Sequence, residues 1–212
     1  MCRGATFCSE LGVDPSQWSL NTPLAFPEVF NTTHTLFISA YEAAIAGDLE
    51  LAKSLLNKTI ERGIRDWYVE HGQMSGFFRF KALGNMPAPK YLGELDPLTS
   101  ITQFETQVYD HDAYRCAYCS NPLIHSKELK NLEKLLGPDN FRTSGTNVQR
   151  HGFIFILRAT LDHVVPLSHG GRTELSNLVT SCWSCNYGKS NYTLAEIGLN
   201  DPRLNRDTKE SD

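Results

Sequence analysis

The chain has 212 residues, of which 41% are apolar and 21% charged, and its formal net charge is −4. These values are typical of a globular protein of one or two domains, and no stretch approaches the roughly 18 continuous apolar residues that span a membrane. The excess of acidic residues lies in the first half of the chain, and neither half is basic enough for charge alone to indicate nucleic-acid binding.

The first elements expected along the chain are helical. Residues 1–30 are rich in Pro, Ser and Asn and show little periodicity, which predicts an irregular arm. Helical spacing then begins near Thr32 and Thr33, either of which is placed to cap the helix, and it is interrupted at Gly47. A second helix follows directly, and a third is expected at about 60–71.

The second half of the chain mixes element types. Residues 84–97 are rich in Pro and Gly and predict a linker. The segment "SKELKNLEKLLG" has leucines on or near one face and predicts a short amphipathic helix. The segment "GFIFILRATLDHVVP" contains β-branched and aromatic residues between glycine and proline, which predicts a strand.

Four of the six cysteines form two C-x-x-C pairs, Cys116 with Cys119 and Cys182 with Cys185. The N-terminal residues have no 7–15-residue apolar core, so we expect no secretory signal and a cytoplasmic protein. In a reducing compartment, paired cysteines are more often metal ligands than disulfides, and two pairs predict a closed four-thiolate zinc site. The alternatives are four unrelated buried cysteines or one redox pair, although a redox pair belongs in a βαβ pattern that this sequence lacks.

The two cysteine pairs enclose a longer pattern. It contains "LDHVVPLSHGGRTELSNL" and continues through the second pair as "CWSCNYGKSN". The order of DHxxP, a GG turn, an NL pair and CxxCNxxK resembles the HNH endonuclease family, whose core is a ββα-metal fold, over roughly residues 114–192. Rival motifs fail, because the "GKS" at 188–190 lacks the first glycine of a P-loop and the H-x-E of zinc deaminases is absent.

This resemblance implies a role for each matched position. His163 corresponds to the general base that activates water, and Asn177 to the residue that orients the loop carrying this base. Asp162 and Asn186 correspond to ligands of a catalytic divalent cation, Mg²⁺ or Mn²⁺. Lys189 follows Asn186 by about one helical turn and is placed to bind a phosphate.

The chemistry of phosphodiester hydrolysis agrees with these roles. A hard divalent cation on oxygen ligands neutralises the phosphoryl charge and assists the leaving oxygen. An imidazole with a pKa near ~6.5 can take a proton from water at neutral pH. Alternation along a strand sends Asp162 and His163 to opposite faces, so the pair indicates a division of labour between metal binding and water activation.

The predicted fold class is α+β, with a mainly α-helical region at 1–105 followed by a small zinc-bound ββα-metal domain at 106–212. The gap between the first cysteine pair and the Asp-His pair is longer than the motif needs, which predicts an insertion at about 122–152. Three basic side chains near its end are expected to be exposed loop residues, with substrate contact as the alternative: Arg142, Arg150 and His151.

The predicted function is a metal-dependent endonuclease that acts on double-stranded DNA, with structural zinc. The alternative is a non-catalytic zinc-bound module that binds nucleic acid or protein. Taken singly, Asp162 could fix the tautomer of His163, Asn177 or Asn186 could be a cap, and Lys189 a solvated surface residue. A binding module needs the cysteines but not the polar set, and the spacing of the whole pattern favours the enzyme.

Overall fold

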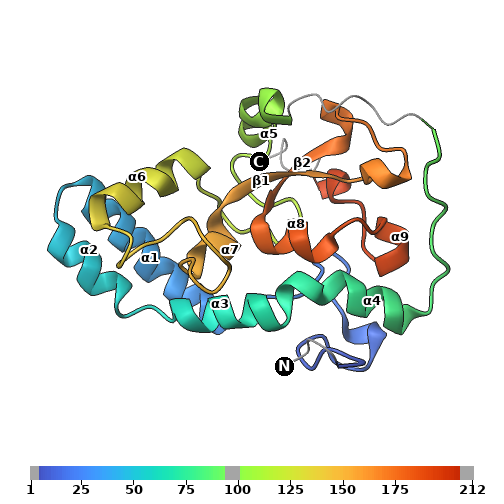
Figure 1. Ribbon diagram of the computed structural model, residues 1–212, viewed down its shortest axis with the longest axis horizontal. Coiled ribbons are helices and arrows are strands. Elements are labelled where there is room, and N and C mark those ends of the chain that lie inside the picture. Colours follow the sequence, from blue (N-terminus) through green and yellow to red (C-terminus); the bar gives the residue numbers. More distant parts are fainter. Residues whose placement is uncertain (1–4, 94–100, 206–212) are drawn as a thin grey trace.

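The computed structural model describes residues 5–93 and 101–205 and shows a mainly helical chain with one small antiparallel sheet (Figure 1). This confirms the predicted α+β class. The helices are α1 (Val29–Ile45), α2 (Leu49–Leu56), α3 (Glu61–Glu70), α4 (Ser75–Leu83), α5 (Glu105–His111), α6 (Ser126–Leu136), α7 (Phe153–Leu157), α8 (Trp183–Lys189) and α9 (Leu194–Ile197), and the strands are β1 (Ala159–His163) and β2 (Leu178–Cys182). None of the described helices combines the length and apolarity needed to cross a membrane.

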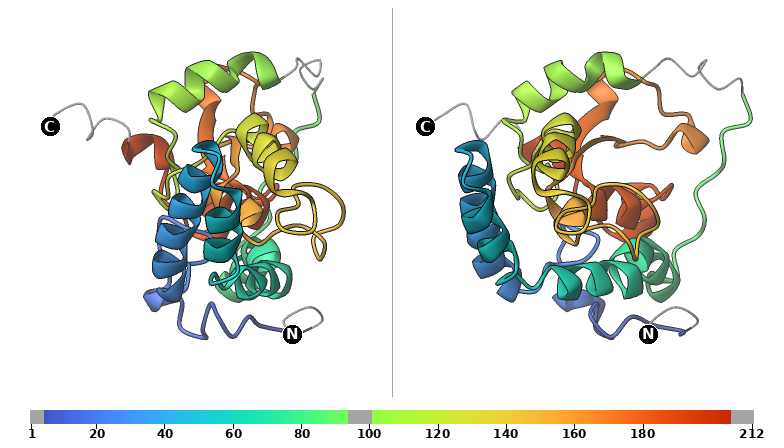
Figure 2. Two further views of the ribbon diagram at one scale, coloured as in Figure 1. Left: turned by 90° about the vertical axis from the view of Figure 1, so that its left-hand side faces the viewer. Right: turned by 60° about the vertical axis from the view of Figure 1, so that its left-hand side comes forward.

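The N-terminal helices largely follow the predicted pattern. The two helices α1 and α2 lie side by side (Figure 2), and the Asp48 carboxylate caps α2 by accepting a hydrogen bond from Leu51 N at 3.0 Å. Neither predicted threonine caps α1, because α1 begins at Val29. Thr33 Oγ1 instead accepts a hydrogen bond from Ile60 N at 3.1 Å, which fixes the start of α3 against α1.

One hydrophobic core joins the N-terminal helices to α6 and α7. The Phe37 ring of α1 lies 4.4 Å from the Phe153 ring of α7, and the Tyr68 ring of α3 stacks on Phe155 at 4.1 Å. The predicted helix α6 is confirmed, and Leu129, Leu132 and Leu136 are buried in the same core, whereas Leu135 is exposed. The predicted insertion therefore packs against the N-terminal helices and shares their core. The division of the chain into two domains at residue 105 stays a prediction.

The predicted strand within residues 152–166 is only partly correct. Residues 153–157 form the helix α7, and the strand β1 covers only residues 159–163. All five residues of α7 are buried. A continuous apolar run that is buried on every side has no alternation, so periodicity alone does not distinguish a helix from a strand.

The two strands and the helix that follows them form a ββα unit. Strand β1 pairs antiparallel with β2, with Asp162 opposite Val179 and His163 opposite Leu178. Helix α8 begins at Trp183, directly after β2, and α5 and α8 lie on opposite sides of the sheet (Figure 1). Because the pairing is antiparallel, the end of β1 lies beside the start of β2, and α8 packs against both strands.

Candidate functional site

The four paired cysteines form one cluster, in which the Sγ atoms lie within 4.8 Å of one another. Cys182 ends β2 and Cys185 lies in the first turn of α8, while Cys116 and Cys119 come from the turn after α5. A tetrahedral zinc ion with Zn–S distances of about 2.3 Å separates its sulfurs by about 3.8 Å. The 3.9 Å between the sulfurs of Cys119 and Cys182 fits this spacing, so the cluster is suited to hold a metal such as zinc.

Backbone hydrogen bonds place these thiols. Cys116 O accepts a hydrogen bond from Ser120 N at 2.8 Å, and Ser120 adopts a positive φ of 60° that closes the turn. Ala117 N donates to Thr180 O at 2.8 Å, which attaches this turn to β2. The first cysteine pair is therefore held against the strand that carries the second pair into α8.

Asp162 is buried, with 4% of its surface exposed, and both of its carboxylate oxygens have partners. Oδ2 accepts a hydrogen bond of 2.6 Å from the Tyr118 hydroxyl, and Oδ1 lies 3.2 Å from Lys189 Nζ. Burial raises the pKa of the Asp162 carboxyl, against the opposing effects of Lys189 and Tyr118. A carboxylate has about four acceptor positions, so further ligand positions remain on Asp162.

Lys189 was expected to bind a phosphate, and its described contacts are internal. The side chain is only 1% exposed, and besides the ion pair with Asp162 it donates to His163 O at 2.9 Å. Lys189 thus connects α8 to the end of β1 and holds two neighbouring residues there. The phosphate contact stays a prediction.

His163 is half-buried at the end of β1, and its Nε2 forms a hydrogen bond of 3.1 Å with Thr173 Oγ1. Burial, and then the charge of Lys189, lower the pKa of the His163 imidazole. A lowered pKa favours the neutral ring near pH 7, and only the neutral ring can accept a proton.

The loop after His163 is held by Asn177, which is itself buried. Asn177 Oδ1 accepts from Val165 N at 2.8 Å, and Nδ2 donates to Val165 O at 3.0 Å and to Arg172 O at 2.9 Å. The backbone also approaches closely at Gly171, where a Cβ atom would lie 1.8 Å from Val165 O. The Asn177 side chain therefore connects both ends of the loop.

Asn186 faces β1 from α8. Its Nδ2 donates to Leu161 O at 3.0 Å and to Thr160 Oγ1 at 3.1 Å. Because a backbone carbonyl only accepts, these contacts fix which side of the amide carries the nitrogen. Asn186 Oδ1 accepts no hydrogen bond from any described residue, so it is available to a ligand.

Four of the predicted polar residues line one cavity of about 340 Å³: Asp162, His163, Asn186 and Lys189. Asn177 does not line it and acts through the loop. The carboxylate of Asp162 and the amide oxygen of Asn186 are hard oxygen donors, which suit Mg²⁺ or Mn²⁺. The cavity lining therefore offers oxygen donors of the type that a divalent cation takes, together with the His163 imidazole.

The sequence analysis missed Tyr118 and Thr173. Tyr118 lies between Cys116 and Cys119 in the sequence, so its place beside the cysteine cluster could have been predicted. The pattern carries no signal that its hydroxyl crosses to Asp162, because this contact joins residues 44 positions apart.

The comparison with known families agrees with this geometry. The family model described as HNH endonuclease matches residues 150–192, a segment that contains α7, both strands and α8. No curated protein and no solved structure matches the chain. The resemblance to the HNH endonuclease family is confirmed over this segment, which indicates a nuclease or nucleic-acid-binding role.

Proposed function

We propose that the protein is a metal-dependent endonuclease that hydrolyses phosphodiester bonds in double-stranded DNA. The main support is the convergence of Asp162, His163 and Asn186 on one cavity within the segment that matches the HNH family. Asp162 and Asn186 would hold the cation, Mg²⁺ or Mn²⁺, which when bound neutralises phosphoryl charge and assists the leaving 3′ oxygen.

The chain's own residues supply the rest of the reaction. The neutral imidazole of His163 takes a proton from the attacking water, and Thr173 at Nε2 limits rotation of the ring. Asn177 holds the loop that follows His163. Lys189 holds the Asp162 carboxylate in place.

The four cysteines are assigned to a structural zinc ion. A closed Cys₄ set leaves no position for substrate, and such sites contribute directly to folding. We further propose that the protein acts in the cytoplasm, where reducing conditions keep the thiols available for zinc.

Plasmid nicking tests the proposal. Purified protein is incubated with supercoiled plasmid and Mg²⁺ or Mn²⁺, and wild type is compared with His163→Ala and Asn186→Ala. Lys81→Gln, at an exposed position on α4, serves as the control. We expect both site variants to lose about 100-fold or more in rate, while Lys81→Gln cuts like wild type.

Zinc content and circular dichroism are measured on the same samples, so that loss of activity is separated from loss of fold. Single-stranded DNA and RNA form additional arms that test the preference for duplex DNA. If folded, zinc-loaded wild type cuts none of these substrates, the protein is a non-catalytic binding module and the proposal is wrong.

A further inference from the structure

A cluster of aromatic and arginine side chains adjoins the proposed site on one face of α8. Trp183 precedes Asn186 by about one helical turn, so both side chains lie on this face. Tyr187, which lines the site cavity, stacks on Trp183 with ring centroids 5.0 Å apart. The guanidinium groups of Arg150 and Arg158 lie over the same indole, 5.0 and 4.8 Å from its centroid.

These two arginines have no acidic partner in the described part of the chain. The Nε atoms of Arg150 and Arg158 are both buried without a hydrogen-bond partner. Arg150 donates one side-chain bond, from Nη1 to Asn147 Oδ1 at 2.7 Å, and Arg158 donates none to a described residue. Glu105 acts on Arg158 only from beyond ion-pair distance, so these two neighbouring cations leave several strong donors for an anion.

The same pair lines a cavity of about 210 Å³ with a third basic residue, Lys130. Ser126 and Ser144 add hydroxyl groups, and no carboxylate is among the described residues around it. Paired guanidinium forks with an additional ammonium group and hydroxyl donors are the chemistry that recognises a phosphate.

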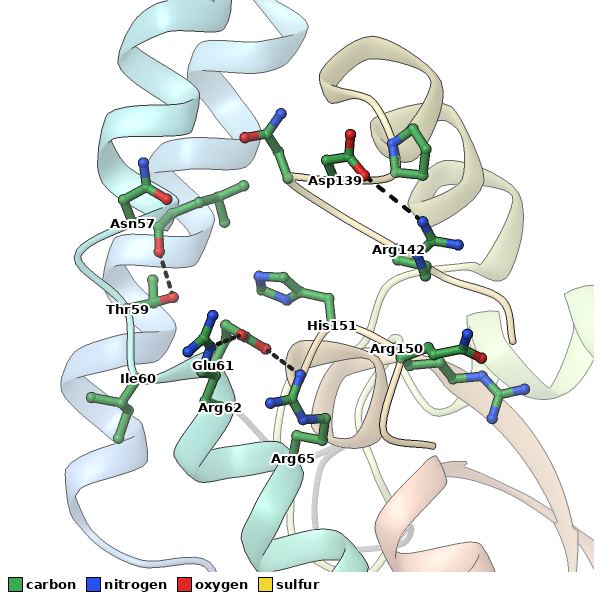
Figure 3. Close-up of a pocket in the computed structure, with 14 residues that line it drawn as sticks. Asn57, Thr59, Ile60, Glu61, Arg62, Arg65, Asp139, Arg142, Arg150 and His151 are labelled. Atoms are coloured by element: carbon green, nitrogen blue, oxygen red, sulfur yellow. Dashed lines mark hydrogen bonds and ion pairs between the residues drawn. The ribbon is translucent and has the colours of Figure 1, made fainter. Parts of the chain in front are cut away.

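A neighbouring cavity of about 490 Å³ provides a contrast (Figure 3). It is also rich in arginine, but Glu61 pairs with two arginines of α3 at 3.8 and 3.9 Å, and Asp139 pairs with Arg142 at 3.9 Å. In Figure 3 the Arg150 guanidinium points away from these pairs. Of the arginines around these two cavities, the two beside Trp183 are therefore the ones without an ion pair among the described residues of the cavity linings.

We propose that Arg150 and Arg158, with Lys130, bind a backbone phosphate of the nucleic acid beside the phosphate that is cleaved. This inference rests on the proposed nuclease function. Trp183 holds the two guanidinium groups, and it lies three residues, about 4.5 Å, along α8 from Asn186. Since each nucleotide rises about 3.4 Å along a duplex, the bound phosphate lies within a few nucleotides of the cleavage position.

Equilibrium binding of a fluorescent DNA duplex, without added divalent cation, tests this site. Affinity is measured between 50 and 200 mM salt for wild type, Arg150→Gln, Arg158→Gln, Arg158→Lys and the charge-matched control Lys81→Gln. Each arginine-to-glutamine change should weaken binding roughly tenfold and reduce the slope of log K against log salt by about 0.9, the value for one phosphate contact.

Two controls separate phosphate binding from a structural role. Arg158→Lys should keep most of the salt slope, because it keeps the charge, and Lys81→Gln should behave like wild type. Arg158 is half-buried, so the melting temperature of each variant is recorded, and the exposed Lys130→Gln repeats the measurement without touching the core. Folded glutamine variants at all three positions with wild-type affinity and slope would overturn the proposal.

Titration with inorganic phosphate distinguishes two sources of the ligand. If the variants lose affinity for inorganic phosphate but bind the duplex normally, the cavity serves a free phosphate and the backbone assignment is wrong. Failure of the nuclease proposal is recognised separately: a wild type that never cuts, but whose duplex binding depends on the arginine pair, keeps this phosphate site and loses only the catalytic function.

Discussion

The Tyr118 hydroxyl donates a hydrogen bond of 2.6 Å to Oδ2 of Asp162. Tyr118 lies between Cys116 and Cys119, and Asp162 lines the cavity of the proposed catalytic site. Burial, and then the charge of Asp162, raise the pKa of the Tyr118 phenol, so it stays protonated and continues to donate. This bond connects the turn that carries the first cysteine pair to the carboxylate proposed to hold the catalytic cation.

Replacing Tyr118 by phenylalanine should therefore lower both the free energy of unfolding and the nicking rate. The change leaves Asp162 Oδ2 buried without its donor, which costs about 1–3 kcal/mol of unfolding free energy, measured by urea denaturation. Zinc content should stay at the wild-type level, because the cysteines are untouched. Tyr91→Phe, at an exposed tyrosine, is the matched control. A Tyr118→Phe protein with wild-type stability and nicking rate would show that this hydrogen bond contributes to neither.

Lys189→Met should be among the most destabilising changes in the ββα unit. It removes the ammonium group 3.2 Å from a buried carboxylate, and breaking such a pair by deleting one partner costs about 3–5 kcal/mol. The double variant with Asp162→Asn should recover part of this loss, since no uncompensated charge then remains. A double-mutant cycle on unfolding free energies measures the recovery, and a Lys189→Met protein as stable as wild type contradicts the prediction.

Removal of zinc should unfold the C-terminal unit, because the cluster joins the turn after α5, the end of β2 and the start of α8. Elemental analysis should find about one zinc per chain, and a strong chelator should abolish the near-ultraviolet circular dichroism of this region. Cys185→Ser should lose the metal, whereas Cys8→Ser, at a buried cysteine outside the cluster, should retain it. Full zinc content in Cys185→Ser would rule out the assigned ligand set.

The buried His151 should make the protein sensitive to mild acid. Burial, and then the charge of Arg65, lower the pKa of His151 to about 3 in the folded state, against about 6.5 in the unfolded chain. The unfolded chain therefore binds a proton first as pH falls, and stability declines between about pH 6.5 and pH 3.

The expected contribution of His151 is a loss of about 2 kcal/mol between pH 7 and pH 5. The free energy of unfolding of wild type and of His151→Phe is measured by urea denaturation at both pH values. The difference between the two proteins gives the contribution of His151, because the other titrating groups are common to both. The Phe variant should show the smaller difference. An equal pH dependence in the two proteins would mean that His151 is protonated similarly in both states.

Much of the site could be predicted because its signals are local in the chain. The cysteine pairs, the Asp-His pair and the asparagine after Cys185 occur at spacings that a turn, a strand end and a helix start impose. The cluster of four thiols and the match to the HNH family over residues 150–192 confirm that part of the prediction. The catalytic assignments remain predictions for the experiments above.

The errors arose where the sequence carries no periodic signal. The strand predicted at 153–157 is the helix α7, because complete burial removes the alternation that separates the two element types. For Lys189 the phosphate contact stays a prediction, and what the sequence did not indicate is that its side chain is enclosed between Asp162 and His163. An isolated lysine in a sequence does not reveal whether its ammonium group meets solvent or a buried carboxylate.

The sequence by itself determined the types and order of the candidate site residues and the resemblance to a ββα family, since these depend on residue identity and short spacings. Only the tertiary structure decided which side chains meet across long separations. Tyr118 reaches Asp162, and Arg150 and Arg158 meet over Trp183, through packing of the insertion and the cysteine turn against β1 and α8. Burial and charge at these contacts are set by the whole core, and no local pattern in the chain encodes them.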